Sequence, residues 1–263
     1  MKVEQGIIEG VDRETSSIYF SCILKKEAEG IVWTDEMDLQ GFLLVWSPYQ
    51  EGFQLMGQPL RKEEWGRFRT WFEHTIPSFL KAWGMECFEY GADTKELADM
   101  FDEIFRDKKI LSEKQKIFHW SGNEVSLKQP DGYQIKLVDR EFLEEEYKGK
   151  EFITEEIKTA YGTLTPYFDH GIAYVAIKDN EIVARADMLF SNGTYGNISI
   201  HTKEEHRRKG LASYLAMKTI KETVKRGLIP IWDCTESNLA SEKTANRCGF
   251  QMVREDIISW FMV

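Results

Sequence analysis

A short basic segment sets the strongest constraint on how this chain can fold. Residues 207–212 read Arg-Arg-Lys-Gly-Leu-Ala, and they directly follow a predicted strand and open a predicted helix. A helix N-terminus presents unpaired backbone N–H groups and the positive end of the helix dipole, which together bind phosphate. Gly210 allows the backbone to approach a diphosphate closely, and the small Ala212 leaves the first turn uncrowded. The segment therefore indicates a phosphate-binding strand–loop–helix unit, with a solvated loop before an ordinary basic helix as the alternative.

Charge is distributed unevenly around this segment. The chain has 263 residues, with 34 Lys and Arg against 44 Asp and Glu, which gives a formal charge of −10. Between Thr202 and Arg226, eight Lys and Arg stand against three Glu, so this stretch carries +5 and the rest of the chain −15. A single basic island suits a small polyphosphate ligand, whereas the acidic remainder argues against binding to nucleic acid or an anionic membrane. The acidic remainder is compatible with a cationic amine as a further ligand.

Cysteine and histidine usage argues against a disulfide scaffold and against a metal site. The four cysteines are widely spaced without a C-x-x-C pair, and the five histidines form no H-x-x-x-H pair. Residues 1–5 lack the features of a signal peptide, and no run of about 18 apolar residues occurs, so we expect no membrane span. With 42% hydrophobic and 30% charged residues, the composition is typical of a globular protein, and we expect a cytoplasmic one.

Turn-forming residues divide the chain near residues 121–132, where they flank a short strand-like piece. We therefore predict an N-terminal mixed α/β domain over residues 1–125 and a second domain over residues 126–263. The many aromatic residues of the first domain are interpreted as a packed core rather than a ligand pocket. Its predicted elements are strands at 41–46 and 52–56, a helix at 61–83 broken or kinked at Pro77, and a helix at 97–105 capped by Asp93 or Thr94.

The second domain has a clearer alternation of strands and helices. An apolar stripe at Tyr214, Met217, Ile220 and Val224 marks its most regular helix. The pattern predicts an α/β (α+β) fold with a mixed sheet flanked by helices. The predicted elements are strands at 133–138, 172–178, 182–190, 195–201 and 228–233, helices from Asp139, at 151–161, at 210–226 and from Ser237 or Asn238 to Gly249, and two closing strands within 251–262.

A second motif makes a family resemblance specific. Asn238, Ser241, Gly249 and Phe250 follow a predicted strand in the spacing N-x-x-S-x-x-x-x-x-x-x-G-F. With the basic segment, residues 195–250 resemble the acetyl-CoA-binding core of the GNAT (GCN5-related) N-acetyltransferases, whose signature is R/Q-x-x-G-x-G/A followed by a strand and an Asn-led helix ending in Gly-Phe. The sequence of these motifs is most similar to that of the bacterial acetyltransferases grouped with the zwittermicin A resistance protein. The motifs cover roughly 55 residues, and the first 120 residues contain none of the family's motifs.

The resemblance implies a C-terminal GNAT fold, with a central splayed sheet, and acetyl-CoA as cosubstrate. The backbone of residues 200–202 would pair with the pantetheine arm, and one of its N–H groups would polarise the thioester carbonyl. Residues 208–213 would wrap the diphosphate, while Asn238 and Ser241 would contact the arm from the other side. The cofactor-binding residues implied in this way are Ile200, His201, Thr202, Arg207, Arg208, Lys209, Gly210, Leu211, Ala212, Ser213, Asn238 and Ser241.

The proton carriers depart from the family pattern. Many GNAT enzymes have a tyrosine acid seven residues after the asparagine, and this position is Ala245 here. Asp233 is the first candidate base, with an ordinary structural carboxylate as the alternative; His201 and Glu236 are further candidates. Cys234 is read as a small core residue or as a nucleophile in a ping-pong scheme. A water chain without a dedicated side chain is the remaining route for the proton.

The predicted function is acetyl-CoA-dependent transfer of an acetyl group to the amine of a small molecule, an antibiotic-like compound included. Acetylation of a protein or peptide amine is one alternative, and a CoA-binding regulatory module without turnover is another. The N-terminal half is expected to form part of the acceptor site or to pack beside it. We expect no metal, no nucleic acid and no membrane as partners. The oligomeric state is left open, a homodimer included.

Overall fold

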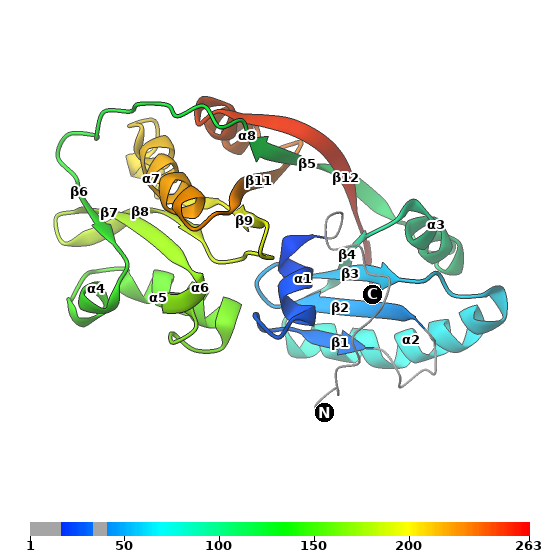
Figure 1. Ribbon diagram of the computed structural model, residues 1–263. Coiled ribbons are helices and arrows are strands. Elements are labelled where there is room, and N and C mark those ends of the chain that lie inside the picture. Colours follow the sequence, from blue (N-terminus) through cyan, green and yellow to red (C-terminus); the bar gives the residue numbers. More distant parts are fainter. Residues whose placement is uncertain (1–16, 34–40) are drawn as a thin grey trace. The chain divides into compact units, whose positions relative to one another are not determined.

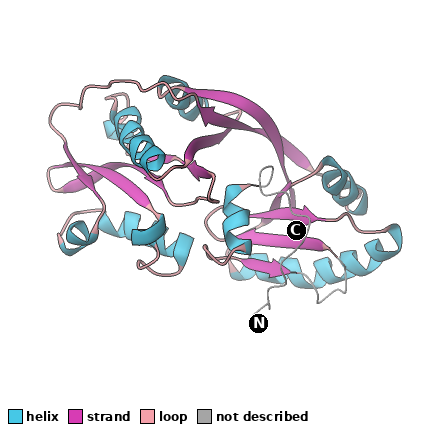
Figure 2. Ribbon diagram, in the orientation of Figure 1, coloured by secondary structure: helices cyan, strands magenta, loops and turns pink. Residues whose placement is uncertain are grey.

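The computed structural model describes residues 17–33 and 41–263, in which helices and strands combine into a mixed α/β fold (Figure 1; Figure 2). The predicted fold class is thereby confirmed. The chain separates into two compact units, one formed by Met1–Lys114 with Asp256–Val263 and the other by Gln115–Glu255. This division lies at residue 114 and assigns residues 256–263 to the first unit, whereas the sequence predicts a boundary at residue 125. The expectation for residues 1–5 lies outside the described residues.

The first unit has a sheet in the order β1-β2-β3-β4-β12. Strands β3 and β4 are parallel, and the other pairs with a described register are antiparallel. Strands β2 and β3 confirm the two predicted strands. The elements are α1 (Ile18–Leu24), β1 (Ile31–Trp33), β2 (Phe42–Ser47), β3 (Gly52–Gly57), the 3-10 turn η2 (Lys62–Glu64), α2 (Trp65–Ala82), β4 (Cys87–Ala92), α3 (Lys95–Ile104) and the end of β12 (Phe250–Met262).

The aromatic residues of this unit form its core, as predicted. Trp46, Phe53, Phe68, Phe72 and Phe88 are at most 2% exposed and belong to one hydrophobic cluster. Such rings bury large apolar areas, which dominate the stabilisation of a core.

Two predicted helix features of the first unit have different outcomes. Helix α2 continues through Pro77, so the predicted break there is wrong. The Thr94 side chain accepts a hydrogen bond from Leu97 N–H, which confirms a cap at the start of α3.

The second unit contains two groups of strands, in the orders β12-β5-β11-β9 and β10-β8-β7-β6. Figure 1 shows α7 on one side of β7 and β8, and α5 on the other side. The elements are the end of β5 (Leu111–Trp120), β6 (Gln134–Leu137), α4 (Arg140–Glu144), α5 (Lys150–Tyr161), α6 (Tyr167–His170), β7 (Ile172–Lys178), β8 (Glu181–Met188), β9 (Tyr195–Asn197), β10 (Ser199–Thr202), the 3-10 turn η3 (Glu204–His206), α7 (Leu211–Lys225), β11 (Ile229–Thr235), α8 (Leu239–Arg247) and the start of β12.

Most predicted elements of this unit are confirmed, together with their local signals. Asp139 accepts a hydrogen bond from Phe142 N–H at 2.8 Å and caps α4. Asp179 and Asn180 both have positive φ, as the tight turn between β7 and β8 requires. Gly227, with a φ of 78°, follows the end of α7.

Two expectations for the strands are wrong, and one strand is missed. Strand β5 is absent from the predicted elements, and the residues that follow it, 123–130, form no strand. The end of the chain forms one long strand, β12, instead of two closing strands. In β5 and in β12, polar residues interrupt the alternation of apolar side chains. Pairing with neighbouring strands, rather than the sequence pattern, therefore decides the conformation of these two segments.

The predicted strand over residues 195–201 is divided at Ile198 into β9 and β10. Strand β9 pairs in parallel with β11, whereas β10 pairs antiparallel with β8. The backbone N–H of Ile198 donates to Ile231 O on β11 at 2.9 Å, and it is at this point that the chain moves from one set of strands to the other. This division agrees with the splayed sheet that the family resemblance predicts.

Helix α7 packs against β7, β8, β10 and β11 and thereby spans both groups of strands. Its predicted apolar stripe is partly wrong, since Val224 is 41% exposed while Leu215 and Thr223 are fully buried. The buried face is wider than a stripe because the helix covers two sheets, and it includes threonines whose hydroxyls donate to backbone carbonyls.

Candidate active site

Gly210 marks the N-terminus of α7 and has a left-handed conformation, with a φ of 81°. A side chain is strained in this conformation, which explains a glycine at this position. The first turn of α7 contains no acidic residue, so its N–H groups and the positive helix end face the loop without a competing carboxylate. The preceding Arg208 also has a positive φ, of 61°. The basic segment is therefore a tightly turned loop that leads into an anion-attracting helix end.

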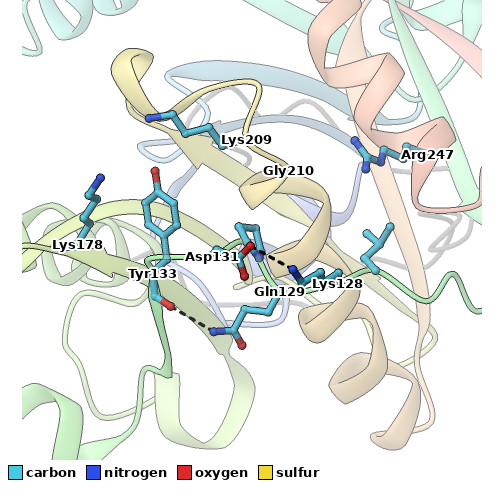
Figure 3. Close-up of a pocket in the computed structure, with 10 residues that line it drawn as sticks. Lys128, Gln129, Asp131, Tyr133, Lys178, Lys209, Gly210 and Arg247 are labelled. Carbon is cyan, nitrogen blue, oxygen red and sulfur yellow. Dashed lines mark hydrogen bonds and ion pairs between the residues drawn. The ribbon is translucent and has the colours of Figure 1, made fainter.

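A pocket of about 550 Å³ lies beside this helix end (Figure 3). Four of its lining side chains are cationic and one is acidic. The lining residues are Leu127, Lys128, Gln129, Pro130, Asp131, Tyr133, Lys178, Lys209, Gly210 and Arg247. Its volume falls within the range typical of small-molecule sites, and its charge suits a phosphorylated ligand.

The segment of residues 127–131, which lines this pocket, is hydrogen-bonded to α7 and to the residue that precedes β6. The Tyr214 hydroxyl donates to Gln129 Oε1 at 3.2 Å, and Gln129 Nε2 donates to Tyr133 O at 3.2 Å. Lys178 lies over the Tyr133 ring, 5.6 Å from its centroid. The cations Lys128, Lys178 and Arg247 are distant in sequence from the basic segment, and sequence reasoning missed them.

Only some of the predicted cofactor residues around Gly210 line the pocket. Lys209 and Gly210 line the pocket. Leu211 and Ser213 are 1% and 5% exposed, so their side chains are not available to a ligand. Arg207 turns back towards β10, where its Nε donates to Thr202 O at 3.2 Å. The structure therefore brings part of the predicted set together around the pocket.

The predicted pantetheine strand is β10, at the edge of its group of strands. The N–H of Ile198 donates to β11, while the N–H of Lys203 donates to β8. Successive N–H groups of a strand point to opposite edges, so those of Ile200 and Thr202 point away from β8. This edge offers backbone donors to an extended ligand at the place where β11 has separated from the strand.

Asn238 and Ser241 lie at the start of α8. Asn238 Oδ1 accepts a hydrogen bond from Ser241 N–H at 3.1 Å and caps the helix, as predicted. The Ser241 hydroxyl accepts a hydrogen bond from Trp232 Nε1 at 2.9 Å. Both side chains thus have structural partners within the second unit.

Asp233 on β11 accepts hydrogen bonds on both carboxylate oxygens. Asn197 Nδ2 donates to its Oδ1 at 2.8 Å, and Gln115 Nε2 donates to its Oδ2. Trp232 and Cys234, which flank Asp233 in sequence, pack in the core with α7 and α8, so Asp233 lies on the opposite face of the sheet. Two amides therefore hold the first candidate base in place.

The other candidate residues have clear surroundings. His201 is exposed on β10, with its ring 5.1 Å from that of Phe152; partial desolvation and nearby Arg185 lower the pKa of His201. Glu236 is exposed. Cys234 is 6% exposed and burial raises its pKa, which favours the interpretation as a core residue over that as a nucleophile.

A buried charge cluster that sequence reasoning missed lies on the face of β8 opposite α7. Arg185 forms ion pairs with Glu156 of α5 and with Asp187, and its own side chain is 5% exposed. Ala184 and Ala186 pack with α7, so Arg185 and Asp187 point to the side of α5. We call these three residues the Glu156–Arg185–Asp187 cluster. A visible signal was present, since an arginine and an aspartate two positions apart occupy one face of an otherwise apolar strand.

Ala245, at the position of the family's tyrosine acid, is a residue of the hydrophobic core. Ala245 is fully buried in the cluster that contains Met217 and Trp232. The methyl group therefore contributes to the core and supplies no proton carrier.

Replacing Ala245 by tyrosine should destabilise the protein. A ring inserted into a packed core forces shifts that cost about 1–3 kcal/mol in the free energy of unfolding. Urea unfolding of Ala245→Tyr measures this loss, and Ala240→Tyr, at an exposed position of the same helix, is the matched control. Equal stability of the two variants would show that position 245 has room for the family's acid.

Within residues 17–33 and 41–263, none of the helices combines the length and the apolar character that a membrane crossing requires. In the same part of the chain, no three His, Cys, Asp or Glu side chains are grouped so that they could hold a metal ion.

Comparison with known proteins identifies the family. An uncharacterized N-acetyltransferase of Bacillus subtilis (strain 168), YdfB, is 25% identical over 130 residues, 49% of each chain, so the match spans about half of that relative. A GCN5-related N-acetyltransferase-like protein from Streptococcus suis superposes with a TM-score of 0.63 at 20% identity, over 94% of this chain and 93% of that one. A GCN5-related N-acetyltransferase from Kribbella flavida gives 0.58 at 14% identity, over 92% and 93%. The model of the GNAT acetyltransferase family matches residues 9–257, and the chain belongs to this family.

Proposed function

We propose that this protein is an N-acetyltransferase that takes an acetyl group from acetyl-CoA and transfers it to the amine of a small molecule. The observation that carries the proposal is the cationic pocket beside Gly210. Coenzyme A presents a diphosphate and a further phosphate, and Lys128, Lys178, Lys209 and Arg247 offer matching charges there. When bound, acetyl-CoA supplies an activated acetyl group in the form of a thioester.

The edge of β10 supports a site for the remainder of the ligand. The N–H groups of Ile200 and Thr202 can donate to an extended pantetheine arm in the manner of an added strand. A donor at this edge can also stabilise the negative charge that develops on the thioester oxygen during attack by the amine. Asn238 and Ser241 would contact the arm only by adding to the structural hydrogen bonds that they already make.

The finer assignments rest on the sequence. The sequence of residues 195–250 supports a relationship to the acetyltransferases grouped with the zwittermicin A resistance protein. This relationship in turn supports an antibiotic-like amine as the acceptor. The four cysteines are free thiols, which is consistent with a cytoplasmic protein. The N-terminal part is proposed to contribute to acceptor recognition.

A second candidate function is CoA binding without turnover. It is favoured by Ala245, which is buried and cannot supply the proton that the family's tyrosine supplies. Acetylation of a peptide amine is a variant of the leading proposal with a different acceptor.

The test combines a binding measurement with a transfer measurement. We expect calorimetry to show binding of acetyl-CoA, and dephospho-CoA to bind more weakly because one phosphate is missing. Transfer is followed as release of free thiol in a panel of small primary amines and lysine peptides. Absence of acetyl-CoA binding contradicts the proposal, binding without any transfer supports the regulatory alternative, and transfer to peptides alone supports the peptide alternative.

A further inference from the structure

The Glu156–Arg185–Asp187 cluster carries an unbalanced charge inside the protein. One guanidinium faces two carboxylates, which leaves a formal charge of −1. Asp187 is fully buried, and its Oδ1 has no hydrogen-bond partner among the described residues. Buried charges are normally paired, so the cluster is suited to a second cation.

Only one member of the cluster is open to a ligand. The side chains of Arg185 and Asp187 are 5% and 1% exposed, whereas that of Glu156 is 26% exposed. A cation from solvent can therefore approach the cluster at the partly exposed Glu156 side chain, whereas Asp187 is enclosed by the protein.

The cluster lies against the strand proposed to hold the thioester. His201 of β10 is directly opposite Arg185 of β8, so both side chains lie on the same face. The Phe152 ring contacts both, at 5.1 Å from the His201 ring and 5.3 Å from the Arg185 guanidinium carbon. Glu156 follows Phe152 by four residues on α5 and so lies one helical turn further along.

We propose that the Glu156 carboxylate binds the ammonium form of the acceptor and removes its proton, with Arg185 and Asp187 as positioning residues. This inference rests on the proposed function and adds the residue that activates the amine. Asp233, the base expected from the sequence, is less suited because both its oxygens already accept amide hydrogen bonds.

With Glu156 as the base, every proton of the reaction is accounted for. The ammonium transfers one proton to Glu156, and the free amine then forms a bond to the thioester carbon. The carbon–sulfur bond breaks with its electron pair on sulfur, and the second proton on nitrogen passes to the thiolate. The Glu156 proton is then released to solvent, so one proton leaves for each amide formed.

The pKa of Glu156 suits a general base. Burial raises its pKa to about 7; Asp187 contributes in the same direction, and Arg185 opposes both. His201 of β10 also lies within electrostatic range of Arg185. A base with a pKa near the working pH combines a large ionised fraction with good proton affinity.

The test is Glu156→Gln, with Glu155→Gln as the matched control. Glutamine keeps the size of the side chain and removes its basicity. Glu155 is the neighbouring carboxylate, 67% exposed and paired with Lys158. With an amine found in the panel above, we expect kcat of Glu156→Gln to fall by about 100-fold or more. The limb of the pH–rate profile near pH 7 should disappear, while calorimetry should show acetyl-CoA affinity within about threefold of the wild type.

The outcomes separate this inference from the proposed function. Wild-type turnover together with an unchanged pH limb in Glu156→Gln contradicts the inference alone and assigns the cluster a structural role. Loss of the limb in Asp233→Asn and not in Glu156→Gln returns the role to Asp233. Absence of wild-type turnover with every amine contradicts the proposed function and, with it, this inference.

Discussion

Replacing Gly210 by glutamate should reduce the affinity for acetyl-CoA by at least about 100-fold, or about 2.7 kcal/mol. Two effects act together. The new carboxylate stands at the N-terminus of α7, where it repels phosphate and competes for the first-turn N–H groups. The left-handed backbone at residue 210 is also strained by any side chain, which disturbs the loop beside the cationic pocket. Calorimetric titration with acetyl-CoA measures the effect.

Gly227→Glu is the control that isolates the site from the strain. Gly227 follows the opposite end of the same helix and has a φ of 78°, and a Cβ atom added there would meet no other atom within 4 Å. The backbone strain is therefore similar, while the new charge is far along the helix from the pocket. We expect Gly227→Glu to bind acetyl-CoA with nearly wild-type affinity. Retained affinity in Gly210→Glu would remove the basis for placing the diphosphate at this helix end.

Replacing Arg185 by methionine should destabilise the second unit by about 3–5 kcal/mol, because the buried Asp187 and the partly buried Glu156 are left without their cation. Methionine fills a similar volume, so loss of charge rather than loss of packing dominates. Urea unfolding at neutral pH gives the free energy. Lys158→Met, which breaks the exposed pair with Glu155, is the control and should change stability by less than about 1 kcal/mol.

The same variant should show a pH-dependent deficit. The folded-state pKa of Glu156 is about 7, above its ordinary value of 4.5, and burial also raises the pKa of Asp187. A raised carboxyl pKa stabilises the folded state below the ordinary value, and this contribution is lost as pH rises through the folded pKa. Arg185 opposes both shifts, so its removal should matter least near pH 4.5 and most above pH 7. An equal deficit at pH 5 and pH 8 would mean that the two carboxylates are not the cause.

The sequence predicts those parts of the fold that depend on local chemistry. The caps at Asp139, Thr94 and Asn238 are confirmed because each side chain bonds to a backbone N–H three residues ahead. The split between β9 and β10 is not visible in the apolar pattern, since Ile198, where the chain divides, and Ile200 in β10 alternate as in one continuous strand. Which neighbour each half selects is decided by the rest of the sheet.

The candidate site shows the same limit. The basic segment at 207–212 identifies the helix end, because an anion-binding motif is contiguous in sequence. Lys128 and Arg247 could not be assigned to the pocket, since they reach it from segments far along the chain. Glu156 was missed because its character depends on Arg185 and Asp187, which join it only through the packing of α5 on β8.

Strand β12 has a consequence for the order in which the protein is completed during synthesis. Its last residues pair with β4, with Ser259 opposite Tyr90, and Phe261 enters the core of the first unit. Residues 93–249, which separate β4 from β12 in the sequence, are therefore synthesised before the sheet of the first unit receives this strand. Until then β4 has an unpaired edge beside exposed aromatic side chains, which is a surface prone to aggregation.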